Sequence, residues 1–311
     1  IRFDDEVTRF LFWRNLIDPY AREWRNGCGR WDLLDVLRLA RVLRPDGIEW
    51  PTRATESGRR VTSFKLTDLT AANQIEHVGA HDALADVRAT VDLARKLKTA
   101  QPKLWDFCLR LRKKEAVWAE IGVGRPFLHV SGMYPAERGG LALVWPLAPH
   151  PTNKNELIVW DCAADPAELL GLKAADIRQR MFTRQEDLPE GVTRLALKTI
   201  HVNKSPIVLG KLPSPEVTER WGLDRTQGLR HAELLAQKGR LLDGLWSEVF
   251  EREPLPPLDV DEDLYGGFVG NDDRRALQRV RALSPQELAD RAAQGKLAFQ
   301  DERLDEIVFR Y

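Results

Sequence analysis

The sequence predicts a mixed α and β protein of several domains, ordered as a helical first third, a small β-barrel and a helical end. Apolar side chains recur with helical spacing over most of residues 1–101. From 127 onwards, short β-prone runs are divided by glycine, proline and asparagine turns, which is typical of strands. A proline-rich stretch at 253–257 precedes a last group of helical patterns. A chain of 311 residues is long enough to bury two or more cores.

Composition limits the kinds of partner. Hydrophobic residues make up 43% and charged residues 30% of the chain, as in ordinary globular proteins. No run of about 18 apolar residues occurs, so we expect no transmembrane helix. The three cysteines, Cys28, Cys108 and Cys162, are far apart and odd in number, which favours a reducing cytoplasm. Because 47 basic residues balance 47 acidic ones, a nucleic-acid partner requires a local basic face.

Two helices and a loop are expected before residue 63. A helical stripe runs through 3–17, with Asp4 in the first turn, where a carboxylate favours the helix dipole. Taken alone, Asp4 is better interpreted as a solvated residue. Asp32 is a plausible N-cap for a second helix, which ends near Arg44. Residues 51–62 carry three arginines, a proline and a glycine, and we interpret them as a polar surface loop.

A third helix begins beside a histidine and two aspartates. Residues 82–98 have the apolar spacing of an amphipathic helix, with Asp82 as its cap. His81 and Asp86 are five positions apart, about 140° around a helix, so they do not share a face if both are helical. We therefore place His81 just before the helix, with its ring over the helix start.

The segment 103–125 is basic and rich in aromatic residues. It holds six basic and three acidic side chains, interleaved with Trp105, Phe107 and Trp118. Two interpretations stay open. The commoner one is an amphipathic helix with a solvated face. The other is a strip that follows a phosphate backbone, with rings on which bases stack.

Strands are expected in the middle of the chain, and two histidines fall on them. We interpret His129 and His201 as hydrogen-bonded core histidines, because neither has a carboxylate at a telling spacing. Near the end, Ser284 and Glu287 have the spacing of a capping box. The expected strands are 127–130, 141–145, 157–160 and 195–202.

The motifs of several enzyme classes are missing. The sequence has no Walker loop, no dinucleotide-binding glycine motif, and no HExxH, GxSxG or CxxC. Carboxylates and histidines remain as candidate catalytic groups. Carboxylates suit Mg²⁺ or Mn²⁺, and two such ions stabilise the attacking and leaving oxygens of a phosphodiester. A histidine that titrates near neutrality accepts the proton of the attacking water.

Two motifs and several longer segments resemble a known family. Phe3-Asp4 and His81-x-Ala83-x-x-Asp86 resemble the second and third motifs of the DEDDh 3′→5′ exonucleases. Further segments, spread over essentially the whole chain, resemble the bacterial exodeoxyribonuclease I family: 2–9, 30–36, 80–83, 129–133 and 201–204.

The resemblance implies a three-domain clamp around single-stranded DNA. It places an α/β ribonuclease H-like exonuclease domain, incomplete at its N-terminus, at 1–101. An SH3-like β-barrel domain follows at 102–252, and a C-terminal α-helical domain starts at 258–311. The implied activity is 3′→5′ degradation of single-stranded DNA to 5′-mononucleotides with two Mg²⁺ ions, or Mn²⁺, in DNA repair and recombination. A cytoplasmic monomer without membrane contact is also implied.

The resemblance also assigns the catalytic residues. Asp4 and Asp86 are metal ligands, and His81 is the general base. The family needs a further Asp-x-Glu on its first strand, which has no counterpart in this chain and is expected to precede Ile1. Two of four carboxylates cannot hold both ions, so we expect the chain alone to be inactive.

Contacts with partners follow from the same resemblance. DNA contacts are expected from four basic residues: Lys65, Arg112, Lys113 and Arg125. The acidic C-terminal tail of single-stranded-DNA-binding protein is expected to bind at Arg44, Phe107 and Arg225. A solvated side chain is an equally favoured interpretation for each arginine of that set.

Two other functions stay open. One is an RNA-trimming DEDDh exonuclease, although simple RNA-trimming relatives lack the predicted barrel and helical end. The other is a non-catalytic module that binds single-stranded DNA and single-stranded-DNA-binding protein.

Overall fold

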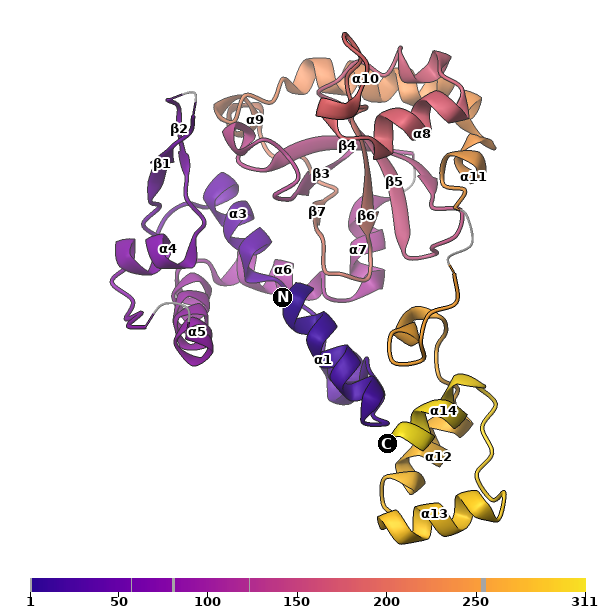
Figure 1. Ribbon diagram of the computed structural model, residues 1–311. Coiled ribbons are helices and arrows are strands. Elements are labelled where there is room, and N and C mark those ends of the chain that lie inside the picture. The colour runs from indigo at the N-terminus through magenta and orange to yellow at the C-terminus, as the bar shows by residue number, and fades with distance from the viewer. Residues whose placement is uncertain (1, 57, 80–81, 123, 253–255) are drawn as a thin grey trace. The chain divides into compact units, whose positions relative to one another are not determined.

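The computed structural model describes residues 2–56, 58–79, 82–122, 124–252 and 256–311 (Figure 1). It divides into two compact units. The smaller unit joins the first 30 residues to the segment from 253 to the end, and the larger unit spans Trp31–Arg252. The first 30 residues thus share a unit with the last segment, and the division at 101 and 252 stays a prediction. In the part of the chain that is described, no helix is long and apolar enough to cross a membrane.

The larger unit begins with a helical half that carries one small hairpin. Asp32 caps α3, because its side chain accepts a hydrogen bond of 2.9 Å from the Leu34 N–H. Asp82 caps α5 in the same way, through the N–H groups of Leu84 and Ala85. Both predicted caps are confirmed. The elements are α3 (Leu33–Leu43), β1 (Thr52–Ala54), β2 (Arg60–Thr62), α4 (Leu66–Ala72), α5 (Ala83–Ala100), α6 (Pro102–Arg110) and α7 (Lys114–Ile121).

Two predictions about this half are wrong. Residues 51–62 form an antiparallel hairpin rather than a loop. Val61 is the one buried residue of the hairpin's described strands. The strands therefore lack an alternation of apolar and polar residues that would predict them from the sequence. The apolar positions of α5 also differ in burial from an ordinary amphipathic helix. Leu84 and Val87 are 55% and 59% exposed, and the buried residues of the helix are Ala89, Leu93 and Leu97 instead.

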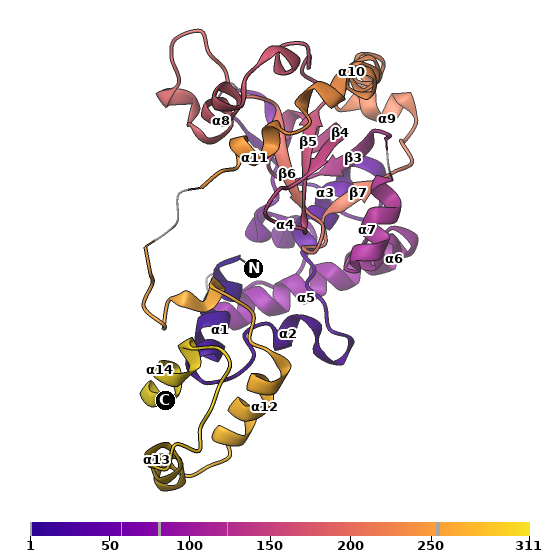
Figure 2. The same cartoon turned by 90° about the vertical axis from the view of Figure 1, so that its right-hand side faces the viewer.

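An antiparallel five-stranded sheet forms the other half of the larger unit. Its strand order is β6-β5-β4-β3-β7. Figures 1 and 2 show α8 and α10 above this sheet, and α6 and α7 below it. Residues 141–145 are all buried. Because both faces of this part of β4 are covered, its sequence is a continuous apolar run and not an alternation of apolar and polar residues. The strands are β3 (Phe127–Val130), β4 (Leu141–Pro149), β5 (Glu156–Asp161), β6 (Leu197–His201) and β7 (Ile207–Leu209), and the helices are α8 (Ala174–Phe182), α9 (Pro215–Arg220), α10 (Arg225–Lys238) and α11 (Leu245–Val249).

The two strand histidines have different surroundings. His129 is 6% exposed and its Nδ1 lies 2.8 Å from the Tyr134 hydroxyl, so the prediction of a core histidine is confirmed. His201 is different. Its side chain is 33% exposed and its Nε2 lies 3.2 Å from Glu156, directly across the β5–β6 pair. The contact with this carboxylate was not predicted, because Glu156 and His201 become neighbours only when β5 and β6 pair.

The smaller unit packs the first helix against the last segment. Trp13 and Leu16 are buried with Leu264 and Ile307 in one apolar cluster. The Trp13 indole N–H donates to the Val260 carbonyl at 2.7 Å. A capping box between Ser284 and Glu287 confirms the predicted start of α13. The helices are α1 (Arg2–Arg14), α2 (Ala21–Trp24), α12 (Asn271–Val280), α13 (Pro285–Ala293) and α14 (Arg303–Arg310).

The burial of His129 predicts a pH-dependent stability. Burial lowers the pKa of His129 from 6.5 to about 3. Between these values the unfolded chain binds a proton that the folded chain excludes, so folding is stabilised above pH 6.5 and loses stability as pH falls towards 3. One such group adds a slope of at most about 1.4 kcal/mol per pH unit. We expect urea denaturation of the His129→Gln variant to show a flatter pH dependence between pH 4 and 6. An unchanged slope would contradict the assignment.

Candidate nucleic-acid interface

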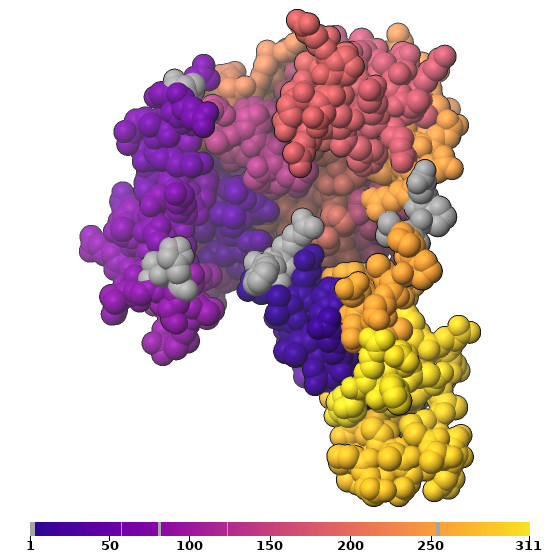
Figure 3. Space-filling model, in the orientation of Figure 1, coloured from indigo at the N-terminus to yellow at the C-terminus, as the bar shows by residue number. Residues whose placement is uncertain are grey.

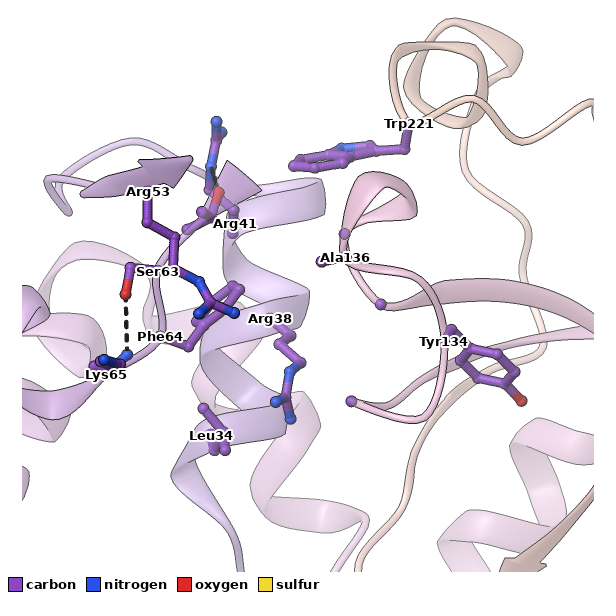
Figure 4. Close-up of a pocket in the computed structure, with 14 residues that line it drawn as sticks. Leu34, Arg38, Arg41, Arg53, Ser63, Phe64, Lys65, Tyr134, Ala136 and Trp221 are labelled. Carbon is purple, nitrogen blue, oxygen red and sulfur yellow. Dashed lines mark hydrogen bonds between the residues drawn. The ribbon is translucent and has the colours of Figure 1, made fainter. Parts of the chain in front are cut away.

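A basic cavity lies between the two halves of the larger unit. Its volume is about 320 Å³. Helix α3 and residues 62–65 form one side, and the loop 132–140 forms the other (Figure 4). The lining residues are Leu34, Arg38, Arg41, Arg53, Thr62, Ser63, Phe64, Lys65, Gly132, Tyr134, Ala136, Gly139, Gly140 and Trp221. Four of these described lining residues are cationic and none is a carboxylate.

Arg38 is held in place from two directions. Its guanidinium pairs with Asp35 one helical turn away and lies 5.6 Å from the centre of the Phe64 ring. Burial raises the pKa of Asp35, while Arg38 opposes that shift by favouring the carboxylate. Asp35 thus orients Arg38 from behind the cavity.

Arg41 lies between two tryptophans. Its guanidinium is 5.3 Å from the Trp221 ring centre and 6.0 Å from that of Trp50. Its Nε donates to the Thr62 hydroxyl at 3.2 Å. Burial, and then the positive charge of Arg220, lower the pKa of Arg41. The structure therefore holds this cation by aromatic faces and a neutral acceptor, in a field of like charge that an anionic ligand would relieve.

Side-chain contacts anchor the loop on the opposite side to the sheet. The Tyr134 hydroxyl is hydrogen-bonded to Nδ1 of His129, and burial raises the pKa of Tyr134. Arg138 forms two hydrogen bonds with the carboxylate of Asp161, at 2.8 and 3.2 Å. Gly139 has a φ of +63°, and a Cβ there would lie 2.8 Å from the Trp221 ring. The loop can approach Trp221 only because this residue is glycine.

This combination of groups suits a single-stranded nucleic acid. Guanidinium and ammonium groups bind phosphates, and exposed aromatic faces stack on bases without regard to their sequence. A cavity with four cations and no lining carboxylate attracts a polyanion more strongly than the neutral chain as a whole.

The structure separates the predicted DNA-contact residues. Lys65 lines the cavity, and its contact with DNA stays a prediction. Arg112 and Lys113 are exposed in the turn between α6 and α7 and do not line it. Arg125 donates to the carbonyls of Ala119 and Glu120 at 3.3 Å, at the C-terminal end of α7. The described contacts give Arg125 a structural role, and DNA contacts at 112, 113 and 125 stay predictions.

The aromatic residues of the strip 103–125 partly serve the core. The rings of Trp105 and Trp31 pack with centroids 4.7 Å apart. Trp31 in turn donates to the carbonyl of Cys108 at 3.0 Å. These contacts favour the interpretation of an amphipathic helix with a solvated face.

Two of the three predicted peptide-binding residues line separate cavities. Arg44 lines a cavity of about 380 Å³ with Leu39, Leu43 and residues 101–104. Arg225 lines another, of about 580 Å³, beside α9. Phe107 is half-buried on α6, with the Arg110 guanidinium 5.7 Å from its ring centre. A common pocket for all three therefore stays a prediction.

The predicted metal site is only partly described. Asp4 lies in the first turn of α1 in the smaller unit, and Asp86 in the first turn of α5 in the larger unit. His81 lies outside the described residues. The imidazole that meets Asp86 is that of His77, with Nε2 2.7 Å from Oδ1. His77 lies four residues before His81 and was not among the predicted site residues.

Thr70 holds the other side of the His77 ring, at 3.3 Å from Nδ1. The described residues contain no group of three or more His, Cys, Asp and Glu side chains arranged to hold a metal ion. Two bound Mg²⁺ ions need more oxygen ligands than the carboxylates of Asp4 and Asp86 supply.

Comparison with known proteins identifies the family. The family model described as "Exonuclease I SH3-like domain" matches residues 112–252, and "Exonuclease I C-terminal domain" matches 258–311. Exodeoxyribonuclease I of Escherichia coli is 40% identical over 315 residues, which cover all of this chain and 64% of the relative. Exodeoxyribonuclease I of Buchnera aphidicola subsp. Acyrthosiphon pisum is 33% identical, and the chain covers 73% of it.

The chain belongs to the exodeoxyribonuclease I family. It spans less than two thirds of the length of its E. coli relative. A crystal structure of E. coli exonuclease I in complex with a dA16 oligonucleotide superimposes on the whole chain with a TM-score of 0.89 at 40% identity, and 65% of that chain is covered. The predicted SH3-like and C-terminal domains of this exodeoxyribonuclease I family member are confirmed, and the ribonuclease H-like domain stays a prediction.

The close approach at Gly139 can be tested by substitution. Gly139→Ala adds a Cβ at positive φ, 2.8 Å from Trp221 and 2.9 Å from Val42. We expect a loss of about 1–3 kcal/mol in unfolding free energy, measured by urea denaturation. Gly191→Ala is the matched control, because Gly191 also has a positive φ, of +79°, and nothing lies within 4 Å of a Cβ there. Equal stabilities of the two variants would contradict the described packing.

Proposed function

We propose that the chain binds single-stranded DNA in the cavity between α3 and the loop 132–140, as part of an enzyme that degrades such DNA from its 3′ end. The observation that carries the proposal is the set of four cations, with no carboxylate, around the rings of Phe64 and Trp221. The E. coli relative described as a complex with dA16 supports this class of ligand.

The two kinds of side chain have different tasks in this proposal. Arg38, Arg41 and Lys65 neutralise phosphates, which gives affinity without sequence preference. Phe64 and Trp221 offer faces on which bases stack, and each stacked base contributes about 1–3 kcal/mol. Neither interaction reads the edge of a base, so the interface suits an enzyme that must accept every nucleotide in turn.

Catalysis is proposed for a longer protein that contains this chain. Asp4 and Asp86 are the proposed ligands of Mg²⁺, with Mn²⁺ as an alternative, and His81 is the proposed base. Held by Asp4, Asp86 and the further Asp-x-Glu, such ions would supply Lewis-acid chemistry for phosphodiester hydrolysis. The required Asp-x-Glu is proposed to lie upstream of Ile1. The products are 5′-mononucleotides, and the proposed setting is DNA repair and recombination in the cytoplasm, as a monomer.

A non-catalytic binding module is the second candidate for the chain as it stands. It is favoured by the contrast between a well-formed basic cavity and the lack of a metal-binding group among the described residues. An RNA-trimming enzyme has no observation in its favour.

Binding is tested with a fluorescent dT oligonucleotide and the 311-residue chain. We expect Arg38→Ala and Lys65→Ala each to weaken binding about 3- to 10-fold and to lower the slope of log affinity against log salt by roughly 0.7, the value of one single-strand phosphate contact. Arg230→Ala is the control, because Arg230 is exposed on α10 and does not line the cavity. Equal affinity of all three variants would rule the cavity out.

Catalysis is tested by release of mononucleotides from 3′-labelled DNA in Mg²⁺. The chain alone is expected to release none, because it lacks two of the four proposed carboxylate ligands. A protein extended upstream to include an Asp-x-Glu is expected to be active, and to lose at least about 100-fold in rate on Asp86→Asn. Degradation of DNA by the unextended chain would overturn the proposed ligand set.

The acidic tail of single-stranded-DNA-binding protein is the proposed peptide partner of Arg44, Phe107 and Arg225. Charge reversal by Arg225→Glu is expected to weaken binding of a tail peptide about 10-fold or more while DNA affinity stays unchanged. The Arg225 guanidinium also donates to the Pro213 carbonyl at 2.6 Å, so thermal stability is measured in parallel. Undiminished peptide binding by a folded variant would remove Arg225 from the site.

A further inference from the structure

The hairpin β1–β2 carries charged side chains that take no part in the apolar core. Its two strands pair only with each other, through Thr52–Thr62, Arg53–Val61 and Ala54–Arg60. Of these six residues only Val61 is buried. A two-stranded ribbon of this length is marginal by itself, so the hairpin depends on anchors at its base. These anchors are the Ser63 N–H to the Pro51 carbonyl, at 2.8 Å, and Arg41 to Thr62.

The hairpin is basic and its charges lack carboxylate partners. Residues 51–62 hold Arg53, Arg59 and Arg60 against one acidic residue, Glu56. Within the described structure none of the three arginines forms an ion pair. Figures 1 and 3 show the hairpin standing out at the edge of the larger unit, where a long polymer could reach it.

Strand alternation divides the three arginines between two faces. Arg53 lines the basic cavity, and Figure 4 shows its side chain extending from the hairpin into that cavity. The Thr55 N–H donates to the Arg59 carbonyl at 2.7 Å, which continues the pairing by one position. Arg59 is therefore two residues from Val61 and on the same face as Arg53, as its diagonal neighbour at about 7–8 Å.

Arg60 belongs to the other face. It pairs opposite Ala54, and its Nε donates to the Thr52 hydroxyl at 3.0 Å. The same short hairpin thus presents Arg53 and Arg59 on one face and Arg60, held by Thr52, on the opposite face.

We propose that β1–β2 is an arm that holds the phosphate backbone of the DNA strand where it leaves the cavity, through Arg53 and Arg59. The inference rests on the proposed DNA binding and extends it beyond the cavity. Arg53 holds the phosphate at the cavity mouth, and Arg59 holds a phosphate further along the strand. The contacts involve no base, so the arm acts on any sequence and lengthens the bound segment.

The test compares oligonucleotides of two lengths on the 311-residue chain. We expect Arg53→Ala/Arg59→Ala to weaken binding of a dT oligonucleotide of about 15 nucleotides by roughly 10-fold and to lower its salt slope by roughly 1.4, for two phosphate contacts. Arg59→Ala alone is expected to leave binding of an oligonucleotide of about 5 nucleotides within 2-fold, because that ligand ends within the cavity. The double variant is expected to weaken binding of an abasic 15-mer by the same factor as binding of the dT 15-mer.

Arg60→Ala is the matched control, with the same loss of charge from the same hairpin but from the opposite face. It is expected to change binding less than about 2-fold. Circular dichroism melting of each variant checks that the chain remains folded. If the wild-type chain binds the 15-mer and the double variant binds it with the same affinity and salt slope, the proposed arm is wrong. The proposed function is not affected by that result. An Arg60→Ala loss equal to that of the double variant would also overturn the arm. Failure of the wild-type chain to bind would overturn both.

Discussion

Repulsion among like charges is the constraint on which the interface depends. Arg38, Arg41, Arg53 and Lys65 line one cavity of about 320 Å³ that has no carboxylate among its described lining residues. Two of the four cations have a neighbouring group that offsets this repulsion. Arg38 has Asp35 behind it, and Arg41 lies against the faces of Trp50 and Trp221. These supports leave the positive potential directed into the cavity.

The fold brings together supports that are far apart in the sequence. Arg38 and Arg41 are three positions apart on α3 and therefore share a face. The sheet half supplies the opposite wall through a loop anchored by Tyr134 and Arg138. Gly139 allows that loop to pack against the Trp221 ring, and the Arg41 guanidinium lies against the same ring. We therefore expect stability and the proposed DNA binding to be linked, because a change in the loop packing would displace the Trp221 ring that supports Arg41.

Much of the fold follows from local signals in the sequence. The caps Asp32 and Asp82, the box at Ser284 and the buried His129 all depend on residues within a few positions, and all are confirmed. The hairpin at 51–62 was missed, because its strands are three residues long and almost fully exposed. The sharing of a core between the first helix and the last segment was missed for another reason, since no local pattern encodes so distant a contact.

The candidate site was predicted less completely. Lys65 came from the resemblance, whereas Arg38, Arg41, Arg53 and Trp221 were missed. Arginines on an amphipathic helix look like a solvated face until a second element is placed opposite them, and Trp221 lies about 180 residues beyond α3. His77 was missed in the same way, because its contact with Asp86 depends on the turn before α5.

Photochemical crosslinking tests the central claim most directly. A dT oligonucleotide with 5-iodouracil at each position in turn is irradiated with the 311-residue chain, and the crosslinked peptides are identified by mass spectrometry. The account predicts crosslinks at Phe64 and Trp221, the aromatic residues proposed to stack on bases in the basic cavity. Crosslinks confined to the basic strip at 103–125, with none on the cavity lining, would contradict it.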